Sequence, residues 1–185
     1  MPDDAPISIP DDFELEFPGA SRSAAEVAPN LVRTAALLIA EIERRSREAA
    51  DLSASAFQTL AILDGADGPL TGRAIAEQLL VTSASMTSLL DTLERRGLIE
   101  RHRHPTDRRM VQILLTAQAR RIVDQVLPAI QATITRALVG VPEPERQQLI
   151  TSLTTIQAQV KTLAGQPPPA ASARRNPRGR RLKYR

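Results

Sequence analysis

A hydroxyl residue precedes each of three short apolar stretches between residues 52 and 115, and this succession constrains the fold more than any other feature. Ser53 is placed to cap the first helix, and Leu52 can pack on Phe57 as a hydrophobic staple. The glycine of Asp64-Gly65 is placed to end this helix. The segment therefore predicts short capped helices joined by turns.

The next two helices form a helix-turn-helix pattern. Thr71 can cap a short helix that ends near Leu79 or Leu80. A turn of three or four residues follows, and a second capped helix then ends at Gly97. Such corners also occur in many helical bundles, so this pattern alone leaves a plain bundle open. The candidate caps of the second helix are Thr82 and Ser83, and its apolar stripe is Met86, Leu89, Leu90 and Leu93.

A short hairpin with a basic tip is expected directly after this helix. Residues 98–101 and 110–115 have the composition of strands, and Pro105 suits the second position of a tight turn between them. A protruding cationic loop is attracted to a phosphate backbone or to a narrow minor groove. The basic residues of this hairpin include Arg101, Arg103, Arg108 and Arg109.

Together these motifs resemble the MarR (multiple antibiotic resistance regulator) family. The resemblance covers residues 29–163 and rests on Leu93-Glu-Arg-Arg-Gly-Leu-Ile-Glu-Arg101, Asp107-Arg-Arg109 and Leu115-Thr116. It implies a mainly α-helical fold with a two-stranded β wing, in which dimerisation helices from both ends of the chain join a winged helix-turn-helix domain. It also implies a homodimer that binds palindromic promoter double-stranded DNA, usually as a repressor, and that releases it when a small-molecule effector binds.

The residues expected to contact DNA lie on two elements. The exposed side of the helix after residue 82 carries hydroxyl groups, which bond phosphates or bases but discriminate bases weakly; an ordinary solvated helix face is the alternative. The resemblance implies that Asp107 orders the wing loop and that Arg109 enters the minor groove, where an ordinary surface ion pair is the alternative. The expected DNA-binding residues are Arg73, Thr82, Ser83, Ser85, Thr87, Ser88, Arg101, Arg103, Asp107, Arg108 and Arg109.

The chain departs from the family pattern in its recognition helix. Family members often carry a basic residue near the positions of Ser88 and Thr92, but both are neutral here and Asp91 is acidic. Leu80 and Ala119 stand where glycine is common in the family. DNA affinity is therefore expected to come mainly from the wing and the flanking arginines, with help from the C-terminal tail.

Long helices at both ends of the domain are expected to form a dimer. One helix runs from Pro29, in its first turn, to about Arg47, and a second follows Thr116 and contains Pro128. A last helix starts between residues 142 and 145 and carries a heptad-like stripe, which could alternatively pack inside one subunit. A two-fold dimer would place two recognition helices about 34 Å apart. The expected dimerisation residues are Leu31, Leu38, Ile42, Leu149, Leu153, Ile156 and Val160.

Charge is divided unevenly along the chain, although the net charge is only +3. Residues 1–21 carry six acids and no base, whereas residues 174–185 carry seven bases and no acid. Both ends are polar and contain proline, which predicts disorder. The expected domains are an acidic disordered tail (1–23), a MarR-type domain (24–164, with the winged helix-turn-helix at 52–116 and dimerisation helices at 24–50 and 117–164) and a basic disordered tail (165–185).

The residue types present exclude several functions. The chain has no Cys, which excludes sensing of oxidants through a thiol, and its two His residues are too few for a closed metal site. No nucleophile–base pair or phosphate-binding glycine loop indicates an enzyme, and no cofactor is expected. Neither a signal peptide nor a membrane span is evident, so a cytoplasmic location is expected. Phe57 is the only aromatic residue of the expected domain, so stacking on an effector would depend on it or on Phe13 and Phe17.

A second hypothesis starts from the basic C-terminal tail. A run of arginines binds polyanions without sequence preference. In this interpretation the protein is a nucleic-acid-binding or scaffold protein that acts through its tail, and the winged domain serves as a dimer module. Deletion of residues 166–185 separates the two hypotheses.

The wing role of Arg109 gives the first prediction. Arg109→Ala should weaken binding to a promoter duplex by about tenfold, because a minor-groove arginine would be lost. Arg136→Ala removes the same charge from an expected dimerisation helix and should change the affinity little. Titrations at matched salt test this, and an unaltered affinity in Arg109→Ala would contradict the proposed wing role.

Overall fold

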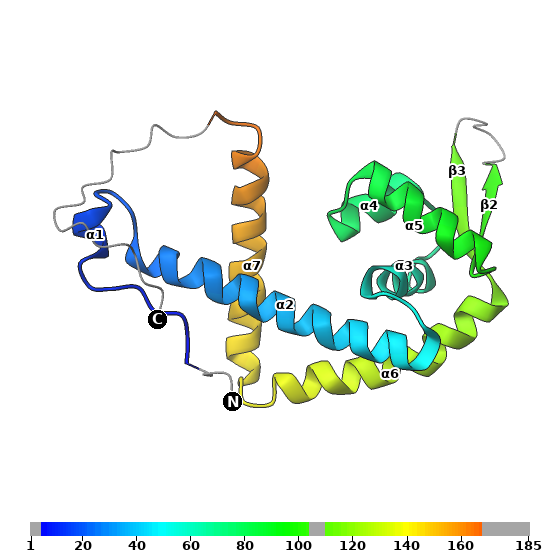
Figure 1. Cartoon of the computed structure of the whole chain (residues 1–185), viewed down its shortest axis with the longest axis horizontal. Coiled ribbons are helices and arrows are strands. Elements are labelled where there is room, and N and C mark those ends of the chain that lie inside the picture. Colours follow the sequence, from blue (N-terminus) through cyan, green and yellow to red (C-terminus); the bar gives the residue numbers. More distant parts are fainter. Residues whose placement is uncertain (1–4, 104–109, 168–185) are drawn as a thin grey trace. The chain divides into compact units, whose positions relative to one another are not determined.

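The computed structural model describes residues 5–103 and 110–167, and the chain divides into two compact units. One unit is Leu38–Leu138, and the other combines Met1–Leu37 with Val139–Arg185. The elements, labelled in Figure 1, are α1 (Phe13–Glu16), α2 (Arg22–Ala50), α3 (Ala54–Asp64), β1 (Leu70–Thr71), α4 (Gly72–Leu79), α5 (Ser83–Arg95), β2 (Ile99–Arg103), β3 (Val111–Leu115), α6 (Ala117–Ala137) and α7 (Glu143–Leu163).

The unit Leu38–Leu138 contains the core, which consists almost entirely of aliphatic side chains. Leu60 and Ile75 are fully buried, and Phe57 is the one aromatic side chain among them. Most of the rest of this core comes from α5, α6 and the sheet. The core therefore holds the short helices α3, α4 and α5 as one packed group. Its other large members include Leu52, Met86, Leu90, Leu93, Leu98, Ile99, Ile113, Val123, Val126 and Ile130.

The sheet is antiparallel, with the strand order β1-β3-β2. The predicted hairpin is confirmed, and Ile99 pairs with Leu115 while Arg103 pairs with Val111. The third strand, β1, was not predicted, because two residues are too short to show an alternating pattern. β1 pairs Leu70 with Ile113, and this pairing attaches the start of α4 to the sheet.

Hydroxyl caps begin four of the helices. In each case the side-chain oxygen accepts a hydrogen bond from the backbone N–H three residues later, which satisfies a donor that the helix itself leaves unpaired. The caps predicted at Ser53 and Thr71 are confirmed. Of the two candidates for α5, Thr82 is the cap. The capping residues are Ser53 (to Ala56), Thr71 (to Ala74), Thr82 (to Ser85) and Thr116 (to Ala119).

Two glycines allow α5 to take its position. Gly97 has a φ of +67°, and the N–H groups of Gly97 and Leu98 donate to the carbonyls of Glu94 and Leu93. This Schellman arrangement ends α5 and turns the chain directly into β2. At the start of α4, a Cβ atom on Gly72 would lie only 3.1 Å from a methyl carbon of Leu90. Glycine there therefore permits close packing of α4 on α5.

Helix α2 begins earlier than the sequence indicated. It starts at Arg22, where the Ser21 hydroxyl accepts a hydrogen bond from the Ala24 N–H at 3.3 Å. Pro29 therefore lies inside the helix and not in its first turn. Proline has no N–H to donate, so the helix lacks one backbone hydrogen bond at this point. The N-terminal expectation was wrong because the periodic apolar residues begin only at Leu31, whereas the hydroxyl cap lies ten positions before it.

The described part of the N-terminal segment also differs from the disordered tail expected on composition. Ile9 is buried, and Asn30 of α2 binds both backbone groups of Ile7, accepting from its N–H at 3.0 Å and donating to its carbonyl at 2.8 Å. The Glu26 carboxylate accepts from the Ile9 N–H at 3.0 Å. These contacts attach the segment to α2 and satisfy its backbone, which composition alone cannot reveal.

The two C-terminal helices match the predicted ones. α6 contains Pro128 and buries Ala119, Val123, Val126 and Ile130, whereas Ile122 is half-buried. α7 begins after Pro142, in the predicted interval. None of its 21 residues, all within the described part of the chain, is buried.

Across the described ranges, no helix is long and apolar enough to span a membrane.

Leu80 gives a prediction on stability. It ends α4 with a φ of +54°, a left-handed conformation that costs a residue with a Cβ atom about 1–2 kcal/mol, and its side chain is 76 % exposed. Leu80→Gly removes this strain, and the larger entropy of the unfolded glycine offsets part of the gain. The free energy of unfolding should rise by about 0.5–1 kcal/mol.

Urea unfolding at one protein concentration measures this change. Gln78→Gly, at an exposed position inside α4, is the matched control and should lower the free energy of unfolding by about 1 kcal/mol. A lower stability for Leu80→Gly would show that the left-handed conformation of Leu80 carries no strain.

Candidate nucleic-acid interface

Helices α4 and α5 form the predicted helix-turn-helix. Met86, Leu90 and Leu93 of α5 are buried and Leu89 is half-buried, whereas the polar residues between them are exposed. The buried stripe therefore fixes which face of α5 meets solvent. The predicted hydroxyl face is exposed throughout: Thr82, Ser83, Ser85, Thr87 and Ser88. Figure 1 shows α5 next to strands β2 and β3, which we call the wing.

Several of these hydroxyl groups also bond to α5 itself. The Thr82 and Ser85 hydroxyls lie 2.9 Å apart, and Thr87 donates to the Ser83 carbonyl at 2.9 Å. A hydroxyl oxygen that donates within the helix can still accept from another group. The first turn of α5 therefore presents a hydrogen-bonding surface with no charged side chain among residues 82–88.

Arg73 lies at the start of α4, with its side chain 87 % exposed. Its guanidinium donates to Glu77 one turn later at 2.8 Å, and this hydrogen bond raises the pKa of Arg73 above its usual value. The pair joins two residues of one helix, so it holds no other element in place. The Arg73 side chain is thus accessible, and its charge is partly balanced.

Arg101 lies against α5. It belongs to β2, and its guanidinium contacts the carboxylates of Asp91 and Glu94. Its side chain is only 28 % exposed, whereas Arg103, at the end of β2, is exposed. The structure therefore joins Arg101 to two acidic residues of α5, a grouping that the sequence analysis did not anticipate. Asp107, Arg108 and Arg109 lie outside the described residues.

The base of the wing is attached to α6 by one side chain. The Thr116 hydroxyl donates to the Gly97 carbonyl at 2.8 Å and accepts from the Ala119 N–H at 3.2 Å. The Thr116 N–H donates to the Leu98 carbonyl at 3.2 Å. The end of α5, the last strand and the start of α6 therefore meet at Thr116. The buried Ala119 stands where the family often has glycine.

Arg96 is a structural residue that sequence reasoning missed. It follows α5, and its two terminal nitrogens donate to the carbonyls of Asp51 at 2.7 Å and of Ala50 at 2.9 Å. A cation is favoured at these carbonyls, because they end α2. The separation of 45 residues between Arg96 and Asp51 explains why local patterns gave no signal.

The junction between α2 and α3 is also held by Glu43. Its carboxylate accepts from the backbone N–H of Ala54, and this hydrogen bond is the main cause that lowers the pKa of Glu43. The buried Ser46 lies 2.9 Å from the Leu52 carbonyl. The start of α3 is therefore attached to α2 through both side chains.

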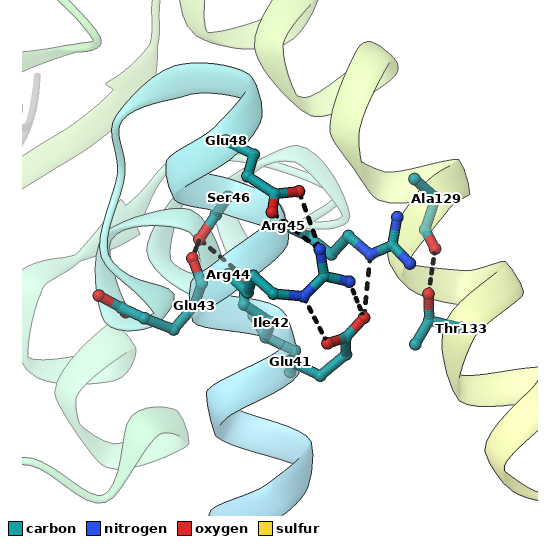
Figure 2. A network of polar contacts seen from close by, with 9 residues as sticks. All are labelled: Glu41, Ile42, Glu43, Arg44, Arg45, Ser46, Glu48, Ala129 and Thr133. Carbon is teal, nitrogen blue, oxygen red and sulfur yellow. Dashed lines mark hydrogen bonds and ion pairs between the residues drawn. The ribbon is translucent and has the colours of Figure 1, made fainter.

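Figure 2 shows the ion pairs on the same half of α2. Arg44 contacts Glu41 and Glu48, and Arg45 also contacts Glu41. Hydrogen bonds from Arg44, and then from Arg45, lower the pKa of Glu41 to about 2. Because the pKa is lowered, the Glu41 pairs are present at neutral pH and are lost only as the pH falls toward 2.

No metal site emerges from the described ranges, in which no three His, Asp or Glu residues cluster as ligands would. The His102 ring lies 3.0 Å from the Glu100 carboxylate. His104, the second His of the chain, lies outside the described residues.

Comparison with known proteins supports the resemblance seen in the motifs. The model of the MarR family matches residues 50–110, which include α3, α4, α5 and the first wing strand, β2. Two regulators of Bacillus subtilis (strain 168) are similar to this chain. The HTH-type transcriptional regulator YkoM is 35% identical over 46% of this chain and 56% of its own length. The HTH-type transcriptional repressor YetL is 31% identical over 55% of this chain and 62% of its own length. The chain therefore spans about three fifths of these relatives.

A solved structure shows the same fold. Sco3205, a MarR family transcriptional regulator from Streptomyces coelicolor in complex with DNA, superimposes with a TM-score of 0.67 at 19% identity. The match covers 83% of this chain and 94% of Sco3205. The similarity thus reaches beyond the matched region into the flanking helices. Residues 50–110 thus match the MarR family, and the solved structure shows that the surrounding fold is shared.

Proposed function

We propose that this protein is a cytoplasmic, sequence-specific DNA-binding transcriptional regulator that acts as a homodimer on palindromic promoter DNA. The observation that carries the proposal is the position of α5, whose hydroxyl-bearing face is exposed directly beside the wing. Buried Met86, Leu90 and Leu93 hold the opposite face. A helix held on one side and free on the other can enter a major groove about 12 Å wide.

The exposed groups indicate how the DNA would be held. The hydroxyls of Ser83 and Ser88 can bond phosphates or base edges, but a hydroxyl discriminates bases weakly. Charge must come from elsewhere, and Arg73 of α4 and Arg103 of β2 are both exposed. Together with the wing tip, these arginines would release counterions on binding, so the affinity should fall steeply with salt.

The surface of α7 supports the homodimer. The residues of its heptad-like stripe all remain accessible to solvent. Leu149 is 46 %, Ile156 36 % and Val160 58 % exposed. No residue of α7 is buried, so nothing in the described part of the subunit covers this apolar stripe fully. A two-fold axis would bring two such helices together and repeat the recognition helix one DNA turn away.

Repression and effector release complete the proposal. A dimer seated on a promoter would exclude polymerase from the same DNA, and a ligand that favours another arrangement of the subunits would lower the DNA affinity. Phe57 is only 2 % exposed, and the rings of Phe13 and Phe17 pack on each other with centroids 5.0 Å apart. An effector would therefore not stack on Phe57, contrary to the simplest expectation from the aromatic content.

The tail hypothesis remains the second candidate function. Its supporting observation is the block of seven bases at residues 174–185, which lie outside the described part of the chain. Selection of bound duplexes from a random DNA pool, with the full chain and with a chain that ends at Gly165, separates the two functions. A single palindromic motif that survives truncation supports the regulator. Loss of all sequence-selective binding on truncation favours the tail.

The dimer proposal predicts the effect of a charge on α7. Val160→Glu should shift the protein from dimer to monomer at micromolar concentration, because it buries a carboxylate in an apolar interface. Ala158→Glu places the same charge on the opposite side of the helix and should leave the mass unchanged. Sedimentation velocity measures both masses. A dimer that persists in Val160→Glu would contradict the role of this stripe.

A further inference from the structure

We propose that Arg101 is a positioning residue that fixes the angle between the wing and the recognition helix, and that it does not bind DNA phosphates. This inference rests on the proposed DNA-binding function. It assigns to Asp91 and Glu94 the role of anchors for the wing, although acidic residues on a recognition helix would otherwise only repel DNA.

The geometry of the three side chains supports this role. One nitrogen of Arg101, Nη1, lies 2.7 Å from an Asp91 carboxylate oxygen and 3.0 Å from a Glu94 carboxylate oxygen. Asp91 and Glu94 are three residues apart on α5, so their side chains share one face of the helix. The guanidinium thus lies between two carboxylates and is the most protected of the three groups, at 28 % exposed against 50 % and 41 %.

The backbone of Arg101 is itself fixed. Arg101 stands in the middle of β2 and pairs with Ile113, which is buried in the core. Its side chain therefore connects a rigid ladder to α5. The chain passes from α5 to β2 through the Schellman turn at Gly97, which is held by backbone hydrogen bonds to Glu94 and Leu93. The Arg101 bridge is a second connection across this turn.

The local charges argue against a phosphate contact. Two carboxylates surround one guanidinium, so the group of three carries an excess negative charge. A phosphate would have to displace both acids from Arg101. An exposed ion pair adds little to stability, so the expected effect of this group is on geometry more than on folding. The Arg73–Glu77 pair makes a useful contrast, because it lies within one helix.

Removal of Asp91 and Glu94 should give opposite results if the two acids act only through their charge and if they hold Arg101 in place. The double variant Asp91→Asn, Glu94→Gln removes two negative charges near DNA and frees Arg101. If charge alone mattered, binding to every duplex would become tighter and the selectivity would stay constant. If Arg101 positions the wing, the freed wing would lose its register on the selected duplex, while affinity for unrelated DNA would rise.

The experiment compares dissociation constants for a duplex selected by the wild-type protein and for an unrelated duplex of equal length. The ratio of the two constants should fall by about tenfold in the double variant. Glu48→Gln with Asp124→Asn removes the same two charges from α2 and α6 and should leave the ratio unchanged. A constant ratio in the Asp91/Glu94 variant would overturn the proposal.

A second variant tests the phosphate contact directly. Loss of a phosphate contact lowers the salt dependence of binding, expressed as the slope of log K against log salt, by about one. Arg101→Gln should lower the affinity for the selected duplex and leave this slope unchanged. A slope reduced by one would assign Arg101 to a phosphate and overturn the proposal. If the wild-type protein selects no duplex at all, the proposed function itself fails, and this inference fails with it.

Discussion

The burial of one stripe of α5 is the interaction on which the rest of the DNA-facing surface depends. Met86, Leu90 and Leu93 pack into the aliphatic core, and at about 25 cal/mol per Å² of apolar surface their burial supplies several kcal/mol. Because a helix has only one orientation that buries this stripe, the hydroxyl face must point to solvent. The Schellman turn at Gly97 then starts the wing at a fixed place. Packing of the core thus determines which side chains of α5 are exposed and available to contact DNA.

The sequence predicted most of this unit, because its signals are local. A capping residue bonds to a backbone N–H only three residues away, and the residues of an apolar stripe follow each other every three or four positions. The caps Ser53, Thr71 and Thr82 and the α5 stripe could therefore be found from the sequence. The contacts that were missed join distant residues. Arg96 reaches Asp51 across 45 positions, and Asn30 reaches Ile7 across 23. Such contacts depend on tertiary packing, which no local pattern encodes.

The candidate site could be predicted only in part, for a related reason. Residue type and spacing predicted an exposed hydroxyl face and a hairpin after it, and both are confirmed, yet they treated every arginine near the wing as equivalent. The structure separates them, since Arg101 contacts two carboxylates while Arg103 is exposed. The distinction arises from Asp91 and Glu94, whose carboxylates lie within 3.0 Å of the Arg101 guanidinium. The role of an acidic residue in a recognition helix therefore depends on which side chain it contacts and not on its charge alone.

This separation also explains how a recognition helix with no basic side chain in its first two turns could still be selective. Weak hydroxyl contacts discriminate only if they are presented at a constant angle and distance, because each contributes little on its own. The fold supplies that constancy through connections on several sides of α5: the core beneath it, Arg96 at its end toward α2, Thr116 at the base of the wing, and Arg101 across to β2. Affinity can then come from exposed arginines that read only phosphates, while selectivity comes from rigid placement. Under the proposed function, charge and specificity would be divided between different residues.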